Sequence, residues 1–210
     1  MITTLLFDFG DVFINLDKTA SARNLERLKV TDFHEDLIHL NARYETGALS
    51  SEEFISTICS RYPHLKTEDV MESWNSILLD FPKQRLDFIK QLKQEGKYRL
   101  LLLSNTNDLH IDYVKKQVPF FDEFQKCFDA FYLSQELAMR KPDPEIFEFI
   151  LKTHQLKPQE VLFIDDTQEN TEAAESLGIH VWNIDPQKED VTQLFEVKGE
   201  LLGPLSPQKQ

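Results

Sequence analysis

Aspartates directly follow two short apolar runs of the sequence. Asp8 follows residues 2–7, and the pair Asp165 and Asp166 follows residues 161–164. Short apolar runs without helical period are typical of buried parallel strands. Open α/β sheets bind their ligands at the carboxyl ends of such strands, so we expect the three carboxylates to meet there. An aspartate can attack phosphorus as a nucleophile to form an aspartyl phosphate, and paired carboxylates suit Mg²⁺.

Two further stretches carry polar groups that suit phosphoryl oxygens. Ser104 and Asn105 follow another apolar run, and Lys141 precedes a proline. The Ser104 hydroxyl and the backbone or amide donors of Asn105 can bind phosphoryl oxygens, while Lys141 adds a point positive charge. Asn170, four residues after Asp166, is placed to orient the acidic pair. Taken singly, these residues fit equally well as helix caps, turn residues or an exposed loop lysine.

The order of these four stretches resembles the four motifs of the haloacid dehalogenase-like (HAD) superfamily. The resemblance spans nearly the whole chain, and its specificity comes from four motifs in order with fitting strand context. Residues 140–144 and the aspartate pair, with residues 134–137 upstream, look most like the α-D-glucose-1-phosphate phosphatase subgroup. The resemblance implies a HAD-like α/β fold, with a Rossmann-like parallel sheet core, helices on both faces and an inserted all-helical cap domain.

The resemblance also implies a role for each motif residue and Mg²⁺ as the cofactor. Asp166 would bind the metal directly and Asp165 through water, while Gly10 would contribute only its backbone carbonyl. The expected site is therefore catalytic Asp8 and Lys141, substrate-binding Ser104, Asn105 and Lys141, metal-binding Asp8, Gly10, Asp165 and Asp166, and Asn170 as their support.

One position departs from the family pattern. Most phosphatases of the family carry an aspartate, the general acid-base, two residues after the nucleophile, where this chain has Gly10. The missing proton donor puts about 10² to 10⁴-fold of rate at stake. We expect Asp11 to point elsewhere in the tight turn, and we expect Gly10 to hold a conformation open only to glycine. The loss is smallest when the leaving group departs as a stable anion, and an anomeric sugar hydroxyl leaves more easily than an ordinary alcohol. The resembled subgroup also has glycine here.

Helical periodicity dominates between the first two apolar runs. Ser50 and Glu53 form a capping box, and Thr67 is expected to cap a further helix. Later in the chain, with Asp108 as an expected helix cap, helices alternate with apolar runs, which predicts a parallel sheet of five or more strands. We expect a core of residues 1–14 and 83–210 and a helical cap of residues 15–82. The tail from about residue 197 has no period and is expected to be loosely held.

Three residues before Gly47 leave their role open. Arg43, Tyr44 and Glu45 either face the active site or lie between helices in solvent. Trp74 lies on an apolar cap face and is expected to serve packing.

The composition bounds partners and compartment. The 210-residue chain has a formal net charge of -13, which argues against nucleic acid and anionic membranes as partners. Cys59 and Cys127 form no disulfide framework, and the N-terminus lacks the basic region of a signal peptide, so a cytoplasmic location fits. No apolar run approaches the roughly 20 residues of a membrane span. We expect a monomer or a weak homodimer that binds a small phosphorylated metabolite.

These residues suggest three possible functions. The first is an Mg²⁺-dependent phosphatase of a small phosphorylated metabolite, such as an anomeric sugar phosphate, acting through an aspartyl phosphate on Asp8. The second is a 2-haloacid dehalogenase, which needs no metal, so the Asp165 and Asp166 pair counts against it. The third is a catalytically decayed binding or scaffold protein, suggested only by Gly10.

Overall fold

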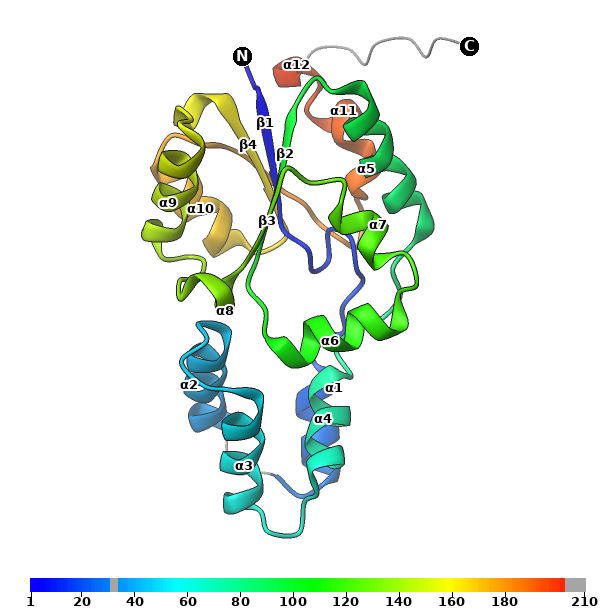
Figure 1. The fold of residues 1–210 in the computed structure, drawn as a ribbon, viewed down its shortest axis with the longest axis vertical. Coiled ribbons are helices and arrows are strands. Elements are labelled where there is room, and N and C mark those ends of the chain that lie inside the picture. The colour runs from blue at the N-terminus through cyan, green and yellow to red at the C-terminus, as the bar shows by residue number, and fades with distance from the viewer. Residues whose placement is uncertain (31–33, 203–210) are drawn as a thin grey trace.

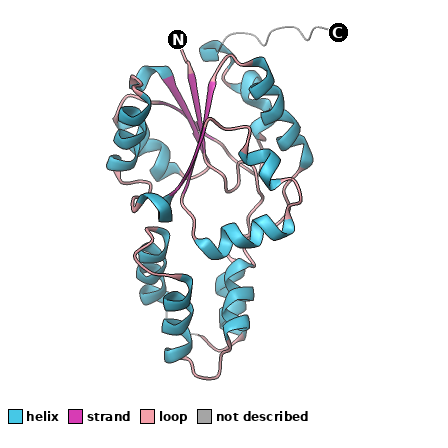
Figure 2. Cartoon of the chain, viewed as in Figure 1, coloured by secondary structure: helices cyan, strands magenta, loops and turns pink. Residues whose placement is uncertain are grey.

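A five-stranded parallel sheet forms the centre of the computed structural model, which describes residues 1–30 and 34–202. The strands lie in the order β3-β2-β1-β4-β5, so the first strand is in the middle. The chain builds the sheet outward from β1 to β3, then returns and continues from β4 on the other side. Figure 2 shows the strands between two helical layers. The strands are β1 (Thr4–Phe7), β2 (Arg99–Ser104), β3 (Ala130–Leu133), β4 (Val161–Asp165) and β5 (His180–Asn183).

Helices cover both faces of the sheet because the strands are apolar on both sides. Leu5 and Phe7 pack into one buried cluster, while Leu6 between them packs into another. α5, α7 and α11 lie over the first face, and α9 and α10 lie over the second (Figure 1). These helices and their neighbours are α5 (Lys83–Glu95), α6 (Asp108–Gln117), α7 (Phe121–Gln125), α8 (Ser134–Leu137), α9 (Pro144–His154), α10 (Gln168–Ser176), α11 (Leu194–Val197) and α12 (Gly199–Leu202).

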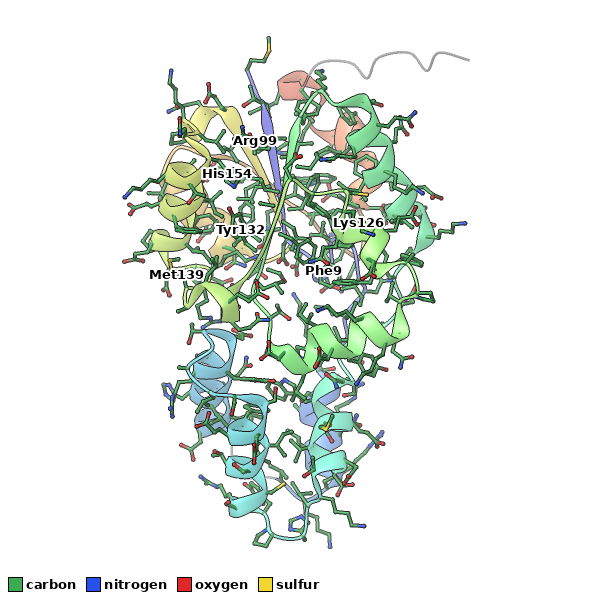
Figure 3. The ribbon with its side chains drawn as sticks, in the orientation of Figure 1. Phe9, Arg99, Lys126, Tyr132, Met139 and His154 are labelled. Carbon is green, nitrogen blue, oxygen red and sulfur yellow. The ribbon has the colours of Figure 1, made fainter. Side chains whose placement is uncertain are left out.

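An aromatic cluster fixes the loop that follows β1. Phe9 and Phe13 both pack against Phe124, with ring centroids 5.5 and 4.9 Å apart. The edge-on and tilted geometries of these pairs add to the stabilisation from burial. Figure 3 shows Phe9 among the side chains between the sheet and the helices. The backbone on either side of Asp8 is thus held by buried side chains.

In the described part of the chain between β1 and α5, four helices form a separate layer at the end of the molecule opposite the termini (Figure 1). They enclose their own apolar cluster, which includes Tyr44, Phe54 and Trp74. The chain enters and leaves this layer through two adjacent linkers, bonded as a short ladder from Asn15 N to Asp80 O at 2.9 Å and from Leu79 N to Asn15 O at 3.0 Å. The helices are α1 (Ala20–Arg27), α2 (His34–Glu45), α3 (Ser51–Arg61) and α4 (Thr67–Asn75).

Local signals located these helix starts to within one residue. The capping box is confirmed, because Ser50 Oγ accepts from Glu53 N while Ser50 N donates to the Glu53 carboxylate. The Asp108 cap is wrong by one residue: Asn107 caps α6, with its side-chain oxygen accepting from His110 N at 3.1 Å. Thr67 is likewise the first residue of α4 and not its cap.

The expected loose tail is wrong for residues 197–202. α12 packs Leu202 into the core, where it is 6% exposed. Its carbonyl accepts from Tyr98 Oη and Lys97 Nζ, each at 2.9 Å. Residues 203–210, the rest of that prediction, lie outside the described residues. Within the described part of the chain, no helix combines the length and apolar character that crossing a bilayer requires.

Candidate active site

Adjacent strand ends bring the first and last acidic motifs together. Phe7 and Ile164 are register partners, and Asp8 N donates to Ile164 O at 2.8 Å. Asp8 therefore lies beside Asp165, at the carboxyl edge of the two strands where the winding direction of the sheet reverses. Such a reversal is where open α/β sheets bind ligands.

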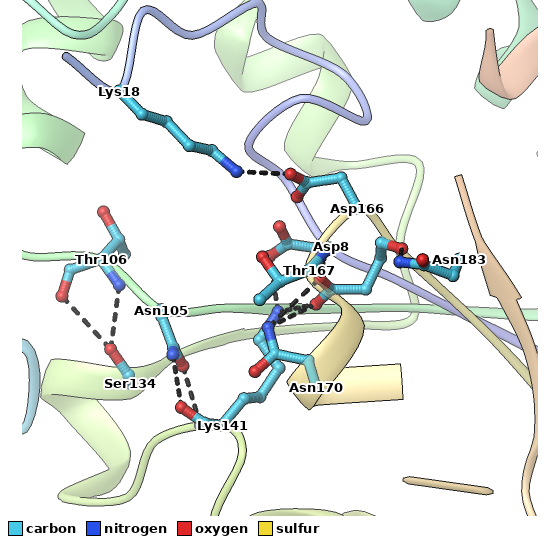
Figure 4. A network of polar contacts seen from close by, with 11 residues as sticks. Asp8, Lys18, Asn105, Thr106, Ser134, Lys141, Asp166, Thr167, Asn170 and Asn183 are labelled. Atoms are coloured by element: carbon cyan, nitrogen blue, oxygen red, sulfur yellow. Dashed lines mark hydrogen bonds and ion pairs between the residues drawn. The ribbon is translucent and has the colours of Figure 1, made fainter. Parts of the chain in front are cut away.

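Lys141 lies between these two carboxylates, and Figure 4 shows its side chain reaching toward Asp8. Its Nζ is 2.7 Å from Asp8 Oδ1 and 2.6 Å from Asp165 Oδ2, and the residue is 1% exposed. Burial opposes the charged form of Lys141, but Asp165 and Asp8 together raise its pKa above the ordinary value. Lys141 is therefore a buried permanent cation and not an exposed loop lysine.

The same burial acts on Asp8 in the opposite sense. Burial raises its pKa to about 7, against the lowering effect of Lys141 and with a further rise from Asp165. Two carboxylates around one lysine leave excess negative charge. A bound cation would favour the charged form of Asp8.

Asp165 is held by donors from two sides. Besides Lys141, it accepts from Thr167 N at 2.8 Å and from Asn170 Nδ2 at 3.0 and 3.2 Å. It is completely buried. Asn170 thus contacts Asp165 as its spacing suggested, and these contacts fix Asp165 as an orienting group for Lys141.

Asp166 points to a different partner. Its Oδ2 forms an ion pair with Lys18 Nζ, which also lies 3.4 Å from Asp11 Oδ2 (Figure 4). The sequence did not single out Lys18; the only signal was its place in the linker between the first strand and the first cap helix. Each of Asp8, Asp165 and Asp166 offers a carboxylate oxygen within 4.8 Å of the other two, a hard-oxygen set that fits Mg²⁺.

The turn after Asp8 differs from the prediction at two residues. Gly10 does not have a positive φ, whereas Asp11 does, at 53°. The glycine-only conformation expected at Gly10 is therefore absent. Asp11 Oδ1 accepts from Leu16 N at 2.9 Å, so its side chain stabilises the turn instead of facing the nucleophile as an acid.

Ser104 and Asn105 both reach the site but act differently. Ser104 is buried beside Asp8 in the lining of one cavity. The Asn105 side chain spends both amide atoms on the backbone of Lys141, through Nδ2 to O at 2.7 Å and N to Oδ1 at 2.9 Å. The amide therefore holds the loop that carries Lys141.

The cavity has a volume of about 620 Å³ and extends from Asp8 to the separate layer formed by helices α1 to α4. Trp74 and His110 line one wall, with their rings stacked 5.8 Å apart. Glu45 also lines the cavity and pairs with Arg140 at 3.0 Å, while Tyr44 is buried and Arg43 is exposed. Of the three residues before Gly47, Glu45 therefore borders the cavity, Tyr44 packs inside the protein and Arg43 faces solvent. A cavity of this size suits a small metabolite.

Known proteins resemble the chain over most of its length. D-ribitol-5-phosphate phosphatase of Bacteroides thetaiotaomicron is 30% identical over 194 residues, which span 87% of this chain and 91% of that protein. A HAD family enzyme from Bacteroides thetaiotaomicron, solved with magnesium and inorganic phosphate, has a TM-score of 0.82 and 32% identity over 93% of this chain and 100% of that one. A predicted HAD-like family hydrolase from Porphyromonas gingivalis has a TM-score of 0.82 and 30% identity, over 98% of this chain and 100% of that one.

A model of the haloacid dehalogenase-like hydrolases matches residues 2–178. The predicted family, hydrolase class and α/β fold are therefore confirmed. The narrower resemblance to the α-D-glucose-1-phosphate phosphatase subgroup stays a prediction. The chain belongs to the haloacid dehalogenase-like hydrolase family.

Proposed function

We propose that the protein is an Mg²⁺-dependent phosphatase that hydrolyses the monoester of a small sugar or polyol through an aspartyl phosphate on Asp8. The observation that carries this proposal is the buried Lys141 between Asp8 and Asp165 at the floor of a cavity of about 620 Å³. The similarity of the chain to a D-ribitol-5-phosphate phosphatase supports the substrate class.

The site residues divide the reaction between them. A carboxylate oxygen of Asp8 attacks phosphorus, the bond to the ester oxygen breaks, and the sugar or polyol leaves as its alkoxide, which takes a proton. Water then hydrolyses the acyl phosphate and restores Asp8. Lys141 and the Ser104 hydroxyl face the phosphoryl oxygens, where positioning and charge supply most of the catalysis. Asp8, the Gly10 carbonyl and Asp166 would hold Mg²⁺, with Asp165 behind them, and the bound ion would supply the positive charge that lets a carboxylate approach a phosphate dianion.

The alternative of a metal-independent dehalogenase is less well supported. That reaction displaces halide from carbon by an aspartate, and two further carboxylates beside the nucleophile repel the charge it must carry. The scaffold alternative rests on Gly10 alone, while the nucleophile, the lysine and the late aspartates are assembled. We place the enzyme in the cytoplasm, since Cys59 and Cys127 are both free thiols.

A screen of phosphorylated metabolites with and without Mg²⁺ tests this function. We expect release of inorganic phosphate from sugar or polyol phosphates that requires Mg²⁺ and disappears in Asp8→Asn. Activity on no phosphate ester, or equal activity in Asp8→Asn, would reject the proposal. Mass spectrometry of enzyme quenched during turnover should show a phosphoryl group on Asp8.

A further inference from the structure

We propose that Asn41, Glu45 and Arg140 form a hydroxyl-recognition site that selects neutral polyol or sugar leaving groups over leaving groups with a second negative charge. The inference rests on the proposed phosphatase function and names the residues that choose among its substrates. Asn41 and Glu45 are one turn apart on α2, on the same helix face. Arg140 comes from the core, directly before Lys141.

Direct contacts join the three side chains into one group. Asn41 Nδ2 donates to Glu45 Oε1 at 2.9 Å, and Arg140 Nη2 lies 3.0 Å from Glu45 Oε2. All three line the cavity that has Asp8 and Lys141 at its floor. A leaving group attached to phosphorus at Asp8 must extend from this floor into the space that the three residues border.

Unpartnered polar atoms are concentrated around this cavity. Among the described residues, seven buried side-chain nitrogen or oxygen atoms have no hydrogen-bond partner, and five belong to residues that line it. Each such atom costs about 1–3 kcal/mol if it stays unpaired, so a cluster of them points to a ligand that completes the pairing. Four of these atoms lie outside any ion pair: Ser21 Oγ, Asn41 Oδ1, Trp74 Nε1 and Arg140 Nε. The fifth, Glu45 Oε2, already lies 3.0 Å from Arg140 Nη2.

The types of these atoms match hydroxyl groups. Arg140 Nε and Trp74 Nε1 only donate, Asn41 Oδ1 only accepts, and Ser21 Oγ does both. A hydroxyl both donates and accepts, so a chain of hydroxyls can satisfy this mixture. Part of the wall is apolar, through Leu37 and Ile77, which suits the C–H surface of a carbohydrate chain.

The charges define what is excluded. Glu45 and Arg140 neutralise each other, so the recognition site offers no net positive charge to a second phosphate or a carboxylate. An anion there would face the Glu45 carboxylate at close range and lose its own hydration. A neutral hydroxylated chain meets neither cost.

The test compares three esters that share a five-carbon backbone: a pentitol 5-phosphate, the pentonic acid 5-phosphate and pentyl phosphate. For each enzyme kcat/KM is measured with Mg²⁺, and preferences are expressed as ratios. A ratio cancels any general loss of activity from a loosened cap. Asn41→Ala keeps the Glu45–Arg140 ion pair, whereas Glu45→Gln removes the negative charge of that pair. Arg43 is exposed on the same helix, so Arg43→Ala is the matched control.

We expect Asn41→Ala to reduce the pentitol-to-pentyl ratio about 10- to 100-fold, since a polar site discriminates strongly by hydrogen bonds to hydroxyls. Glu45→Gln should raise the pentonate-to-pentitol ratio about tenfold or more by removing charge repulsion. Arg43→Ala should leave both ratios unchanged. As a readout independent of turnover, the pentitol 5-phosphate should raise the Tm of Asp8→Asn, and less so when Asn41→Ala is added.

The failures of the two proposals are distinguishable. If the wild type hydrolyses the esters but Asn41→Ala lowers all of them by the same factor, the recognition site is wrong and the phosphatase stands. Unchanged ratios in both Asn41→Ala and Glu45→Gln lead to the same conclusion. If the wild type hydrolyses no phosphate ester, the proposed function falls and this inference falls with it.

Discussion

The two ends of the active-site cavity differ in how completely their polar groups are paired. At the floor, Lys141 Nζ has two carboxylate partners and Asp165 has donors from Lys141, Thr167 and Asn170. At the cap end, Asn41 Oδ1 and Arg140 Nε are buried without partners. The polar groups at the floor therefore hold their reactive geometry without a ligand. The unpaired polar groups at the cap end find hydrogen-bond partners only when a ligand binds. Catalysis and recognition are separated along one cavity.

The difference predicts that floor residues control the reaction and cap residues control the choice of substrate. Asp8→Asn gives the largest expected effect. An amide is neither a nucleophile nor a good Mg²⁺ ligand, so we expect kcat to fall by more than about 10³-fold for every ester. Steady-state rates on the wild type's best and poorest substrates measure this. A substrate-dependent loss would contradict the separation of the two ends.

Asp8→Asn should also change stability, in the direction that the Asp8 pKa fixes. Its folded-state pKa of about 7 lies above the ordinary 3.8, so its contribution to stability is complete below pH 3.8 and is lost as the pH rises toward 7. Without Mg²⁺ at pH 8, the variant should be more stable than the wild type, by up to about 4 kcal/mol. Denaturant unfolding with a chelator present measures this. A less stable variant at pH 8 would show that the Lys141 contact outweighs the burial cost.

The absent acid gives the next effect. Wild-type rates should rise steeply with leaving-group acidity, from alkyl to anomeric to aryl phosphates. In Gly10→Asp the added Cβ comes too close only to the flexible tip of Leu16, 2.8 Å away, while Asp8 Oδ2 lies 3.9 Å away. Gly10 has no positive φ, so the variant should fold. We expect alkyl phosphate turnover to increase about 10- to 100-fold and the dependence on leaving-group pKa to flatten.

Two controls accompany Gly10→Asp. Gly10→Ala adds the Cβ without the acid, and Asp11→Asn removes a carboxylate that already accepts from Leu16 N. Neither should flatten the wild-type dependence on leaving-group pKa. If wild type shows no such dependence and Asp11→Asn acquires one, then Asp11 is the acid and the interpretation of Gly10 is wrong.

Gly47 tests how the cap end is positioned. Its φ is 67°, and a Cβ there would lie 2.2 Å from the backbone oxygen of Gln135 in the core. Gly47→Ala should therefore push the cap away from α8 and lower kcat/KM for hydroxylated esters. Gly96 is a matched control, with a φ of 62° and nothing within 4 Å of an added Cβ. We expect Gly47→Ala to cost about 1–3 kcal/mol more than Gly96→Ala in unfolding experiments. Equal costs would mean that the cap accommodates the added methyl.

The floor was largely predictable from the sequence, and the cap end was not. Asp8, Asp165 and Asp166 follow apolar strands, and parallel strands deliver such residues to one edge whatever the details of the loops. Lys141 was predicted from the order of the motifs. The two hydrogen bonds between the Asn105 side chain and the Lys141 backbone depend on a loop conformation that the sequence does not display. The sequence therefore left open whether the backbone or the amide of Asn105 binds phosphoryl oxygens.

The recognition residues depend on how one layer docks on another. Asn41 and Arg140 are 99 positions apart in the sequence, and both contact Glu45 because α2 packs near the loop before Lys141. Periodicity along α2 predicts which face is apolar, but not which polar residue of the other face borders a cavity. Lys18 escaped notice for the same reason, since its partner Asp166 lies 148 positions away.

The smallest effect is expected at the junction of the two ends. His110 of α6 lies 3.0 Å from Asn75 Oδ1 of α4 through its Nδ1, and burial lowers its pKa to about 3. The unfolded chain gains a proton near pH 6.5 and the folded one does not, so stability falls as the pH drops from 6.5 toward 3. The loss from this group reaches about 1.4 kcal/mol at pH 5.5. His110→Gln retains an amide donor for Asn75 but cannot titrate, so urea unfolding between pH 7.5 and 5 should show a shallower loss than in the wild type. Parallel curves would mean that His110 is protonated in the folded protein as well as in the unfolded chain over this pH range.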